Sequence, residues 1–203
     1  MGKLVVGTFV TVDGVMQAPG GPDEDREGGF EHGGWLVPHF DEELGQFMDG
    51  LIGRSDALLL GRKTYEIFNG YWPNQGDEDP MARKLNSVPK YVASRTLASV
   101  DWNNSELLQG DAADAVERLK RELDGEIQVA GSSDLIQTLL EHDLVDEVQL
   151  IVFPVVLGTG KRLFGDGTTP RALRLAESKT TPSGVALQRY ERVGEPEYGT
   201  VGS

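Results

Sequence analysis

The sequence predicts an α/β fold whose central sheet is mostly parallel, with antiparallel strands late in the chain. Segments with the apolar patterns of strands and of helices mostly alternate along the chain, as they do in parallel sheets. The first strand-like segment, Leu4 to Val12, is almost continuously apolar and β-branched, which is typical of a strand buried on both faces. The last two, 173–177 and 185–193, are joined through Thr181-Pro-Ser-Gly184 and predict a terminal hairpin.

The elements between these segments follow from periodicity and capping. Apolar residues at helical spacing from Phe40 to Ile52 predict an amphipathic helix. Asp111 stands at the N-cap position before the apolar stripe 115–123 of another helix. In chain order, the predicted strands are 4–12, 57–60, 90–93, 127–129, 148–156 (with Pro154 near its end), 173–177 and 185–193, and the predicted helices start near 40, 61, 111 and 132.

The length and composition indicate one globular domain. The chain has 203 residues, of which 38% are hydrophobic and 7% aromatic, and these values are ordinary for a chain with a full core. We therefore expect a single domain over residues 1–193 and a flexible tail over residues 194–203.

Charge and missing residue types exclude several classes of function. With 19 basic and 33 acidic residues the net charge is −14, which argues against nucleic acid as a partner because such binding needs a basic face. The chain has no cysteine, which excludes thiol catalysis, and its 3 histidines lack ligand spacing, so we expect no metal site. Without an apolar leader or a membrane-spanning stretch, we expect a cytoplasmic protein with no membrane partner.

The most informative stretch is Ile127 to Leu140, because its apolar period switches at Gly131 from that of a strand to that of a helix. A strand that turns through Gly131-Ser132-Ser133 into a helix directs free backbone N–H groups and the positive end of the helix dipole at one point. That point is a natural seat for phosphate. The alternative interpretation is an ordinary turn in which Ser132 is the N-cap of the helix.

Two more strand ends carry residues that suit phosphate. In Gly61-Arg62-Lys63-Thr64, two cations stand at a helix start, where they oppose the dipole unless an anion binds. Ser94 and Arg95 follow another strand, and the planar guanidinium suits phosphate oxygens. Because ligands of open α/β sheets collect at the carboxyl ends of strands, we expect these pieces to form one site. By contrast, Gly158-Thr-Gly160-Lys161 fails as a nucleotide-triphosphate loop, because Arg162 replaces the required Ser or Thr.

Five pieces, in this order, resemble the dihydrofolate-reductase-like family. They are Thr11-Val-Asp13-Gly14, Gly61-Arg-Lys-Thr64-Tyr-Glu, Lys90-Tyr-Val-Ala-Ser94-Arg95-Thr, Gly131-Ser-Ser-Asp-Leu135 and the segment from Val145 to Gly160. The chain is most similar to the reductase domain of the bifunctional riboflavin-biosynthesis deaminase–reductase and its stand-alone bacterial relatives. The resemblance covers residues 3 to 193 and implies a three-layer fold that binds NADPH.

The resemblance also implies roles for individual residues. Gly131, Ser132, Ser133 and Leu135 would hold the pyrophosphate of NADPH. The 2′-phosphate and adenosine end would lie against Arg62, Lys63 and Thr64, with Ser94 and Arg95, and Gly61 belongs to the same cofactor-binding set. The first strand and the Asp13-Gly14 loop would lie near the nicotinamide, and relatives of this kind associate as homodimers.

Hydride transfer also needs a proton donor near the nicotinamide. Asp41, early in the first helix, is one candidate by resemblance, although an acid there also simply complements the helix dipole. Asp13 is the other, and its alternative role is to form an Asp-Gly turn. The polar loop 18–34 has the composition of a lid or a disordered segment, and Trp72 either walls a substrate pocket or plugs the surface.

The sequence therefore predicts an NADPH-dependent reductase that transfers hydride to a small heterocyclic or carbonyl-containing substrate. The alternative is a nucleotide-binding module without catalysis.

Overall fold

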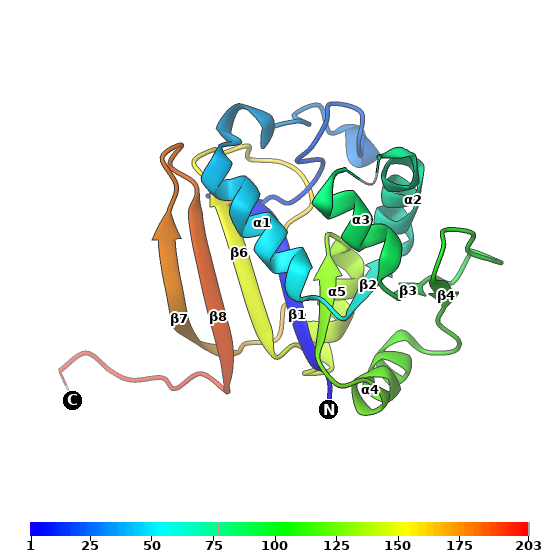
Figure 1. The fold of residues 1–203 in the computed structure, drawn as a ribbon. Helices are drawn as coiled ribbons and strands as arrows, with labels where there is room; N and C mark the ends of the chain where they lie inside the picture. Colours follow the sequence, from blue (N-terminus) through cyan, green and yellow to red (C-terminus); the bar gives the residue numbers. More distant parts are fainter. Residues whose placement is uncertain (77, 203) are drawn as a thin grey trace.

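The computed structural model describes residues 1–76 and 78–202, and in these residues the chain forms an eight-stranded sheet in the order β4-β3-β2-β5-β1-β6-β8-β7 (Figure 1). The pairings from β4 to β6 are parallel, whereas β6–β8 and β8–β7 are antiparallel. The predicted fold class is thus confirmed. The strands are β1 (Lys3–Thr11), β2 (Ala57–Gly61), β3 (Lys90–Ala93), β4 (Ser105–Leu107), β5 (Glu126–Ala130), β6 (Glu147–Phe153), β7 (Ala172–Thr180) and β8 (Ala186–Gly194).

Helices cover both faces of the sheet, which gives three layers. Alternate residues of β2 show the division, because Leu58 and Leu60 pack with Tyr65 and Leu85, whereas Leu59 packs in the cluster that contains Ile136. The helices α1 (Glu42–Arg54), α2 (Arg62–Tyr71) and α3 (Pro80–Ser87) therefore lie on one face, and α4 (Ala112–Glu122) and α5 (Ser133–Glu141) on the other. Short 3₁₀ turns occur at Glu27–Gly29, Val37–His39 and Trp72–Asn74.

Two elements were not predicted from the sequence. The helix α3 is short and begins at Pro80 after Asp79, whose carboxylate accepts hydrogen bonds from the Met81 and Ala82 amides. The edge strand β4 has three residues and pairs with β3. The predicted N-cap of α4, Asp111, and the terminal hairpin β7–β8 are confirmed.

Lys90 is a fully buried cation at the start of β3. Its ammonium group donates to the carbonyl oxygens of Leu85, at 2.8 Å, and of Val88, at 2.9 Å, and lies 4.3 Å from the centroid of the Trp102 ring. It thereby satisfies carbonyl groups that the end of α3 leaves without helical partners.

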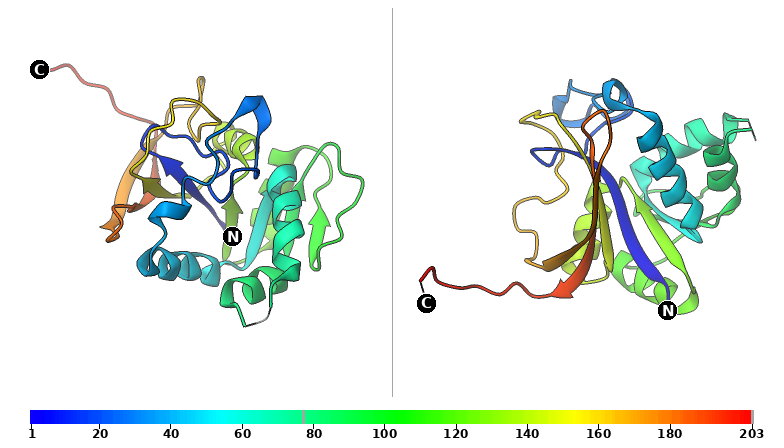
Figure 2. Two further views of the ribbon diagram at one scale, coloured as in Figure 1. Left: turned by 90° about the horizontal axis from the view of Figure 1, so that it is seen from above. Right: turned by 60° about the vertical axis from the view of Figure 1, so that its left-hand side comes forward.

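All the parallel strands end at the same edge of the sheet, where the long loops gather (Figures 1 and 2). The segment after β8 extends away from the body of the protein, and its predicted flexibility stays a prediction (Figure 2). Among the described residues, no helix is long and apolar enough to cross a membrane.

Candidate functional site

A pocket of about 200 Å³ opens at the carboxyl ends of β1 and β5. We call it the central pocket. Its apolar wall comes mainly from α1, α2 and α3, and Trp72 belongs to this wall, which favours the pocket role over the surface plug. Its polar lining is Thr8, Gln17, Glu24, Asp25, Lys63, Thr64, Gln128, Ser132, Ser133 and Lys161.

Two of the predicted strand–helix junctions meet in this pocket. The Gly61 N–H donates to the Ser132 hydroxyl at 2.8 Å, and the Ser132 N–H donates to the Thr64 hydroxyl at 3.0 Å. The Ser132 hydroxyl in turn donates to the Ala130 carbonyl at 2.8 Å. Residues 71 positions apart are therefore tied directly, and the first turns of α2 and α5 lie beside each other. The two positive helix ends converge on one region of the pocket.

Ser132 occupies the N-cap position of α5, as the alternative interpretation of this turn expected. Its side chain, however, makes no capping hydrogen bond, because its hydroxyl is engaged with β2 and β5 instead. Its backbone is left-handed, with φ of 61°. The hydroxyl is thus a structural cross-link between the two junctions.

Gly131 makes the close approach of the junctions possible. Its φ is +52°, a left-handed conformation that glycine adopts without strain. A Cβ atom at this position would lie 2.8 Å from the Thr64 hydroxyl oxygen. Glycine therefore lets this turn pack directly against the Thr64 side chain in the first turn of α2.

The lysines that line the pocket are held by acidic residues of the loop 18–34. Lys161 Nζ lies 2.6 Å from Asp25 Oδ2 and 2.6 Å from Glu27 Oε2. Lys63 Nζ pairs with the same Glu27 oxygen and lies 3.5 Å from Asp25 Oδ1. Burial opposes charging of Lys161, but the hydrogen bonds with Asp25 and Glu27 outweigh it and raise its pKa.

The loop 18–34 packs on the fold through a few apolar residues. Phe30 and Ala18 are buried with Val15 in a small cluster. The Gln17 amide group donates to the carbonyl oxygens of Asp25, at 3.1 Å, and Glu27, at 3.0 Å. These few side chains supply packing contacts that the polar composition of the loop did not indicate.

Of the residues predicted to hold the adenosine end, Lys63 and Thr64 line the central pocket, whereas Arg62, Ser94 and Arg95 do not. Arg62 joins two of the predicted pieces, because its guanidinium group contacts the Thr96 hydroxyl at 2.8 Å as well as Glu66 at 2.9 Å. The Ser94 hydroxyl accepts hydrogen bonds from the Thr96 and Leu97 amides, and Arg95 is exposed. Leu135 is buried in the core, so only its backbone is placed to face a ligand.

Neither predicted proton donor lines the pocket. Asp13 accepts hydrogen bonds from the Thr11 hydroxyl and from the Leu157 and Gly158 amides. The Thr11 hydrogen bond is the main cause that lowers the pKa of Asp13 to about 2. This carboxylate joins the turn after β1 to the loop that follows β6.

Asp41 has a similarly structural geometry. It is the N-cap of α1 and accepts from the Leu44 amide at 2.8 Å and from the Ser183 amide at 3.0 Å. The Leu44 hydrogen bond is the main cause that lowers the pKa of Asp41 to about 2. Both carboxylates are ionised near neutral pH, so the structural alternatives named for them fit the geometry better than proton donation. Their catalytic roles stay predictions.

Glu24 is a lining residue that sequence reasoning did not single out. Its carboxylate accepts hydrogen bonds from the Gly20 amide at 2.6 Å and the Gly21 amide at 3.2 Å. Burial raises its pKa. The signal in the sequence was its place in the long loop 18–34, which has the composition of a lid, but nothing local distinguished it from the other acids there.

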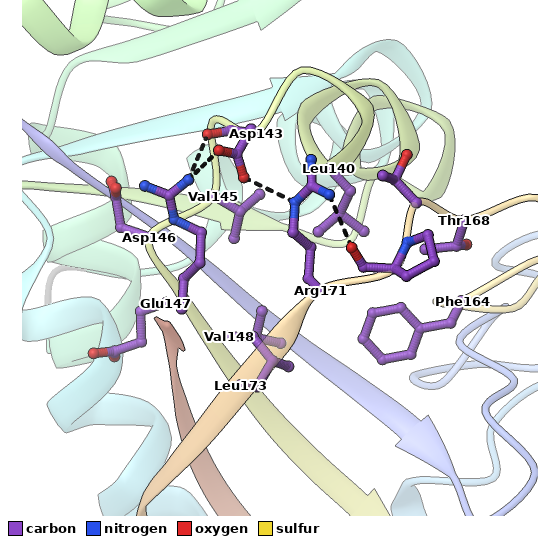
Figure 3. A pocket seen from close by; sticks show the side chains of 13 residues that line it. Leu140, Asp143, Val145, Asp146, Glu147, Val148, Phe164, Thr168, Arg171 and Leu173 are labelled. Carbon is purple, nitrogen blue, oxygen red and sulfur yellow. Dashed lines mark hydrogen bonds and ion pairs between the residues drawn. The ribbon is translucent and has the colours of Figure 1, made fainter. Parts of the chain in front are cut away.

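A second cavity, of about 300 Å³, lies at the opposite end of β6 (Figure 3). Its walls are mostly apolar, and its charged groups pair with each other, since Asp143 binds both Arg171 and Arg192. None of the predicted site residues lines it. Among the described residues, no cluster of three or more side chains suits a metal ion.

Comparison with known proteins agrees with the resemblance found in the sequence. The model of the RibD C-terminal domain family matches residues 2–187. The uncharacterized protein YyaP of Bacillus subtilis (strain 168) is 30% identical over 191 residues, which cover 93% of this chain and 94% of YyaP. YwjB of the same organism, also uncharacterized, is 30% identical over 132 residues, or 65% of this chain and 71% of YwjB.

Solved structures support the fold. A putative riboflavin biosynthesis protein from Shewanella sp. PV-4 aligns with a TM-score of 0.68 at 22% identity, over 94% of this chain and 99% of that one. A diaminohydroxyphosphoribosylaminopyrimidine deaminase/5-amino-6-(5-phosphoribosylamino)uracil reductase from Thermotoga maritima aligns with a TM-score of 0.62 at 15% identity. That alignment covers 95% of this chain and 57% of the bifunctional one.

Proposed function

Because this chain belongs to the RibD C-terminal domain family, we propose that it is an NADPH-dependent reductase that transfers hydride to a small heterocyclic or carbonyl-containing substrate. The observation that carries the proposal is the contact between the two strand–helix junctions in the central pocket. It places the first turns of α2 and α5 side by side, with Gly131 allowing their close approach. Such paired helix N-termini favour a pyrophosphate.

The residues present fit a dinucleotide of this kind. The turn Gly131-Ser132-Ser133 lines the central pocket, and glycine at 131 lets it pack closely against Thr64 of the neighbouring helix start. The backbone amides of Gly131 and Ser133 would hold the pyrophosphate, and the Ser132 amide, which donates to the Thr64 hydroxyl, keeps that side chain beside it. Arg62 and the neighbouring Arg95 would hold the 2′-phosphate from the exposed side of the same edge, because guanidinium groups bind phosphate through a planar fork.

When bound, NADPH supplies the hydride, and the chain's own residues orient the substrate and exclude water. Residues Gly7 to Phe9 of β1 form one wall of the central pocket, and Met48, Leu51 and Phe68 contribute to its apolar side. A flat, mostly apolar ring fits between such walls. The reductase activity named for the Thermotoga maritima relative, which acts on a substituted uracil, supports a heterocyclic substrate.

Reduction also consumes a proton, and Glu24 is the side chain that we propose to hold it beside the substrate. Glu24 and Asp25 are the carboxyl groups of the pocket lining, and Asp25 is committed to Lys161 and Lys63. No lysine or arginine in the described part of the chain forms an ion pair with Glu24. Because burial favours its protonated form, Glu24 suits proton donation better than Asp13 or Asp41.

A nucleotide-binding module without catalysis would keep the same binding turn and lose only the chemistry. The two proposals separate in a screen that follows NADPH absorbance with heterocycles, quinones and 5-amino-6-(5-phosphoribosylamino)uracil. Substrate-dependent oxidation that Glu24→Gln slows at least tenfold supports the reductase. Tight NADPH binding with no oxidation across the screen supports the module.

Cofactor choice tests the assigned arginines. We expect the wild type to bind NADPH more tightly than NADH. We expect Arg62→Ala/Arg95→Ala to lose most of that difference, because charge-assisted hydrogen bonds to phosphate are each worth roughly 1.5–3 kcal/mol. Both dissociation constants follow from fluorescence titration. Equal affinity of the wild type for the two cofactors would contradict the proposal.

A further inference from the structure

We propose that Asp25 and Glu27 form an internal counter-anion that occupies a phosphate subsite made by Lys63 and Lys161, and that a phosphate group of the nucleotide displaces it. The loop 18–34 would then be a lid whose position depends on anion binding. This inference rests on the proposed function for the identity of the nucleotide, NADPH. The subsite itself follows from the contacts of four side chains.

The two lysines come from distant parts of the chain and share the same two acids as partners. Lys63 lies in the first turn of α2, and Lys161 lies in the loop after β6. Both line the central pocket, as does Asp25. Asp25 and Glu27 each contact both lysines, so the four charges form a closed, neutral cluster at the wall of the pocket.

The cluster explains how the protein tolerates a cation at the start of α2. A lysine in the first turn of a helix opposes the helix dipole, so Lys63 requires an anion nearby. The chain supplies that anion itself, from the loop 18–34. A phosphate that approaches the first turns of α2 and α5 would meet Lys63 already neutralised, so it must compete with Glu27 and Asp25.

The exposure of these side chains would allow a phosphate to replace the two acids on the lysines. The Glu27 side chain is 58% exposed and the Lys63 side chain 51%, so their pairing is open to solvent and cheap to break. The Lys161 side chain, at 27%, is less exposed and stays beside the pocket when the acids leave. A phosphate offers more negative charge than one carboxylate and could also accept hydrogen bonds from the backbone amides at the start of α5, which in the described part of the chain donate none to Asp25 or Glu27.

The test compares two double variants that remove the same charge from the same loop. Asp25→Asn/Glu27→Gln abolishes the counter-anion, and Asp23→Asn/Glu31→Gln removes two exposed acids that do not touch either lysine. We expect the first variant to bind NADPH about fivefold to tenfold more tightly than wild type, the scale of the two ion pairs that the exposed Glu27 side chain makes with the lysines. The control should stay within about twofold, the scale of the long-range charge effect that both variants share.

Hydrogen exchange of the wild type gives an independent readout. The Glu27 amide donates to Asp25 Oδ1 at 3.0 Å, so its exchange reports on this part of the loop. Saturating NADPH, or inorganic pyrophosphate as a smaller probe, should accelerate exchange at Glu27 as the acids leave the lysines. This measurement needs no variant to fold.

The outcomes separate this inference from the proposed function. Equal or weaker NADPH binding by Asp25→Asn/Glu27→Gln, or unchanged exchange at Glu27 in saturated wild type, overturns the counter-anion and leaves the reductase proposal standing. If Asp25→Asn/Glu27→Gln binds NADPH and the wild type does not, the result supports a counter-anion that is strong enough to prevent NADPH binding. If neither wild type nor variant binds NADPH at millimolar concentration, the proposed function and the inference fail together.

Discussion

Replacing Gly131 by alanine separates the structural role of this turn from its role in binding. Alanine at φ of +52° costs roughly 1–2 kcal/mol, because an L-residue is strained in the left-handed region. The new Cβ would also lie 2.8 Å from the Thr64 hydroxyl oxygen and 3.3 Å from its methyl carbon. Such overpacking adds roughly 1–3 kcal/mol. We expect NADPH binding to weaken at least tenfold, because Thr64 must move and the turn that it holds through the Ser132 amide moves with it.

Gly110→Ala is the matched control. Gly110 also has a left-handed backbone, with φ of +84°, but a Cβ at this position would meet no described atom within 4 Å, and the residue does not line the central pocket. Gly110→Ala should therefore show only the strain of a left-handed alanine, roughly 1–2 kcal/mol. This strain should lower the melting temperature by about 2–8 °C, because 1 kcal/mol corresponds to about 2–4 °C at this chain length. Gly131→Ala should melt lower still. If the two variants melt together and both bind NADPH like wild type, the reasoning about this turn is refuted.

Three further predictions concern stability and assembly. Asp13 and Asp41 have folded pKa values of about 2 against an ordinary 3.8, so their stabilisation is complete above pH 4 and is lost as pH falls towards 2. In Asp13→Asn/Asp41→Asn, the free energy of unfolding measured in urea should depend less on pH between pH 4 and pH 2. The same pH dependence as in the wild type would contradict this prediction. Lys90→Met should cost roughly 1–3 kcal/mol, because it leaves the Leu85 and Val88 carbonyls unpaired, and an equally stable variant would show that these hydrogen bonds contribute nothing. We also expect a homodimer that uses the exposed edge strand β7. Light scattering should then give twice the 22.1 kDa chain mass and Leu175→Asp should halve it, whereas a wild-type monomer at micromolar concentration would refute the proposal.

The fold was predictable because its signals are local. A continuous apolar run is typical of β1, and the capping aspartate at 111 and the turn at 181–184 each act within a few residues. The strand β4 has no such signal, because three residues at an edge are held by their pairing with β3. The helix α3 presents only two buried side chains, too few for a visible period.

The candidate site was predictable only in part, for the same reason. The turn at Gly131 can be recognised in the sequence, because the spacing of apolar residues changes there from that of a strand to that of a helix. The contacts that complete the pocket are nonlocal: Lys161 meets Asp25 across 136 residues, and Ser132 meets Gly61 across 71. No local sequence pattern predicts these long-range contacts. Asp13 and Asp41 were predicted as proton donors because each stands in a recognisable local motif. In the structure both carboxylates accept backbone hydrogen bonds, as those motifs require.

The most direct test of the central claim is a crystal structure of the protein soaked with NADPH. We predict density for the pyrophosphate against the backbone amides of Gly131 to Ser133, between the first turns of α2 and α5. The nicotinamide should lie in the central pocket beside β1. Density for the cofactor elsewhere, or an empty pocket at millimolar NADPH with the site open to solvent, would contradict the account.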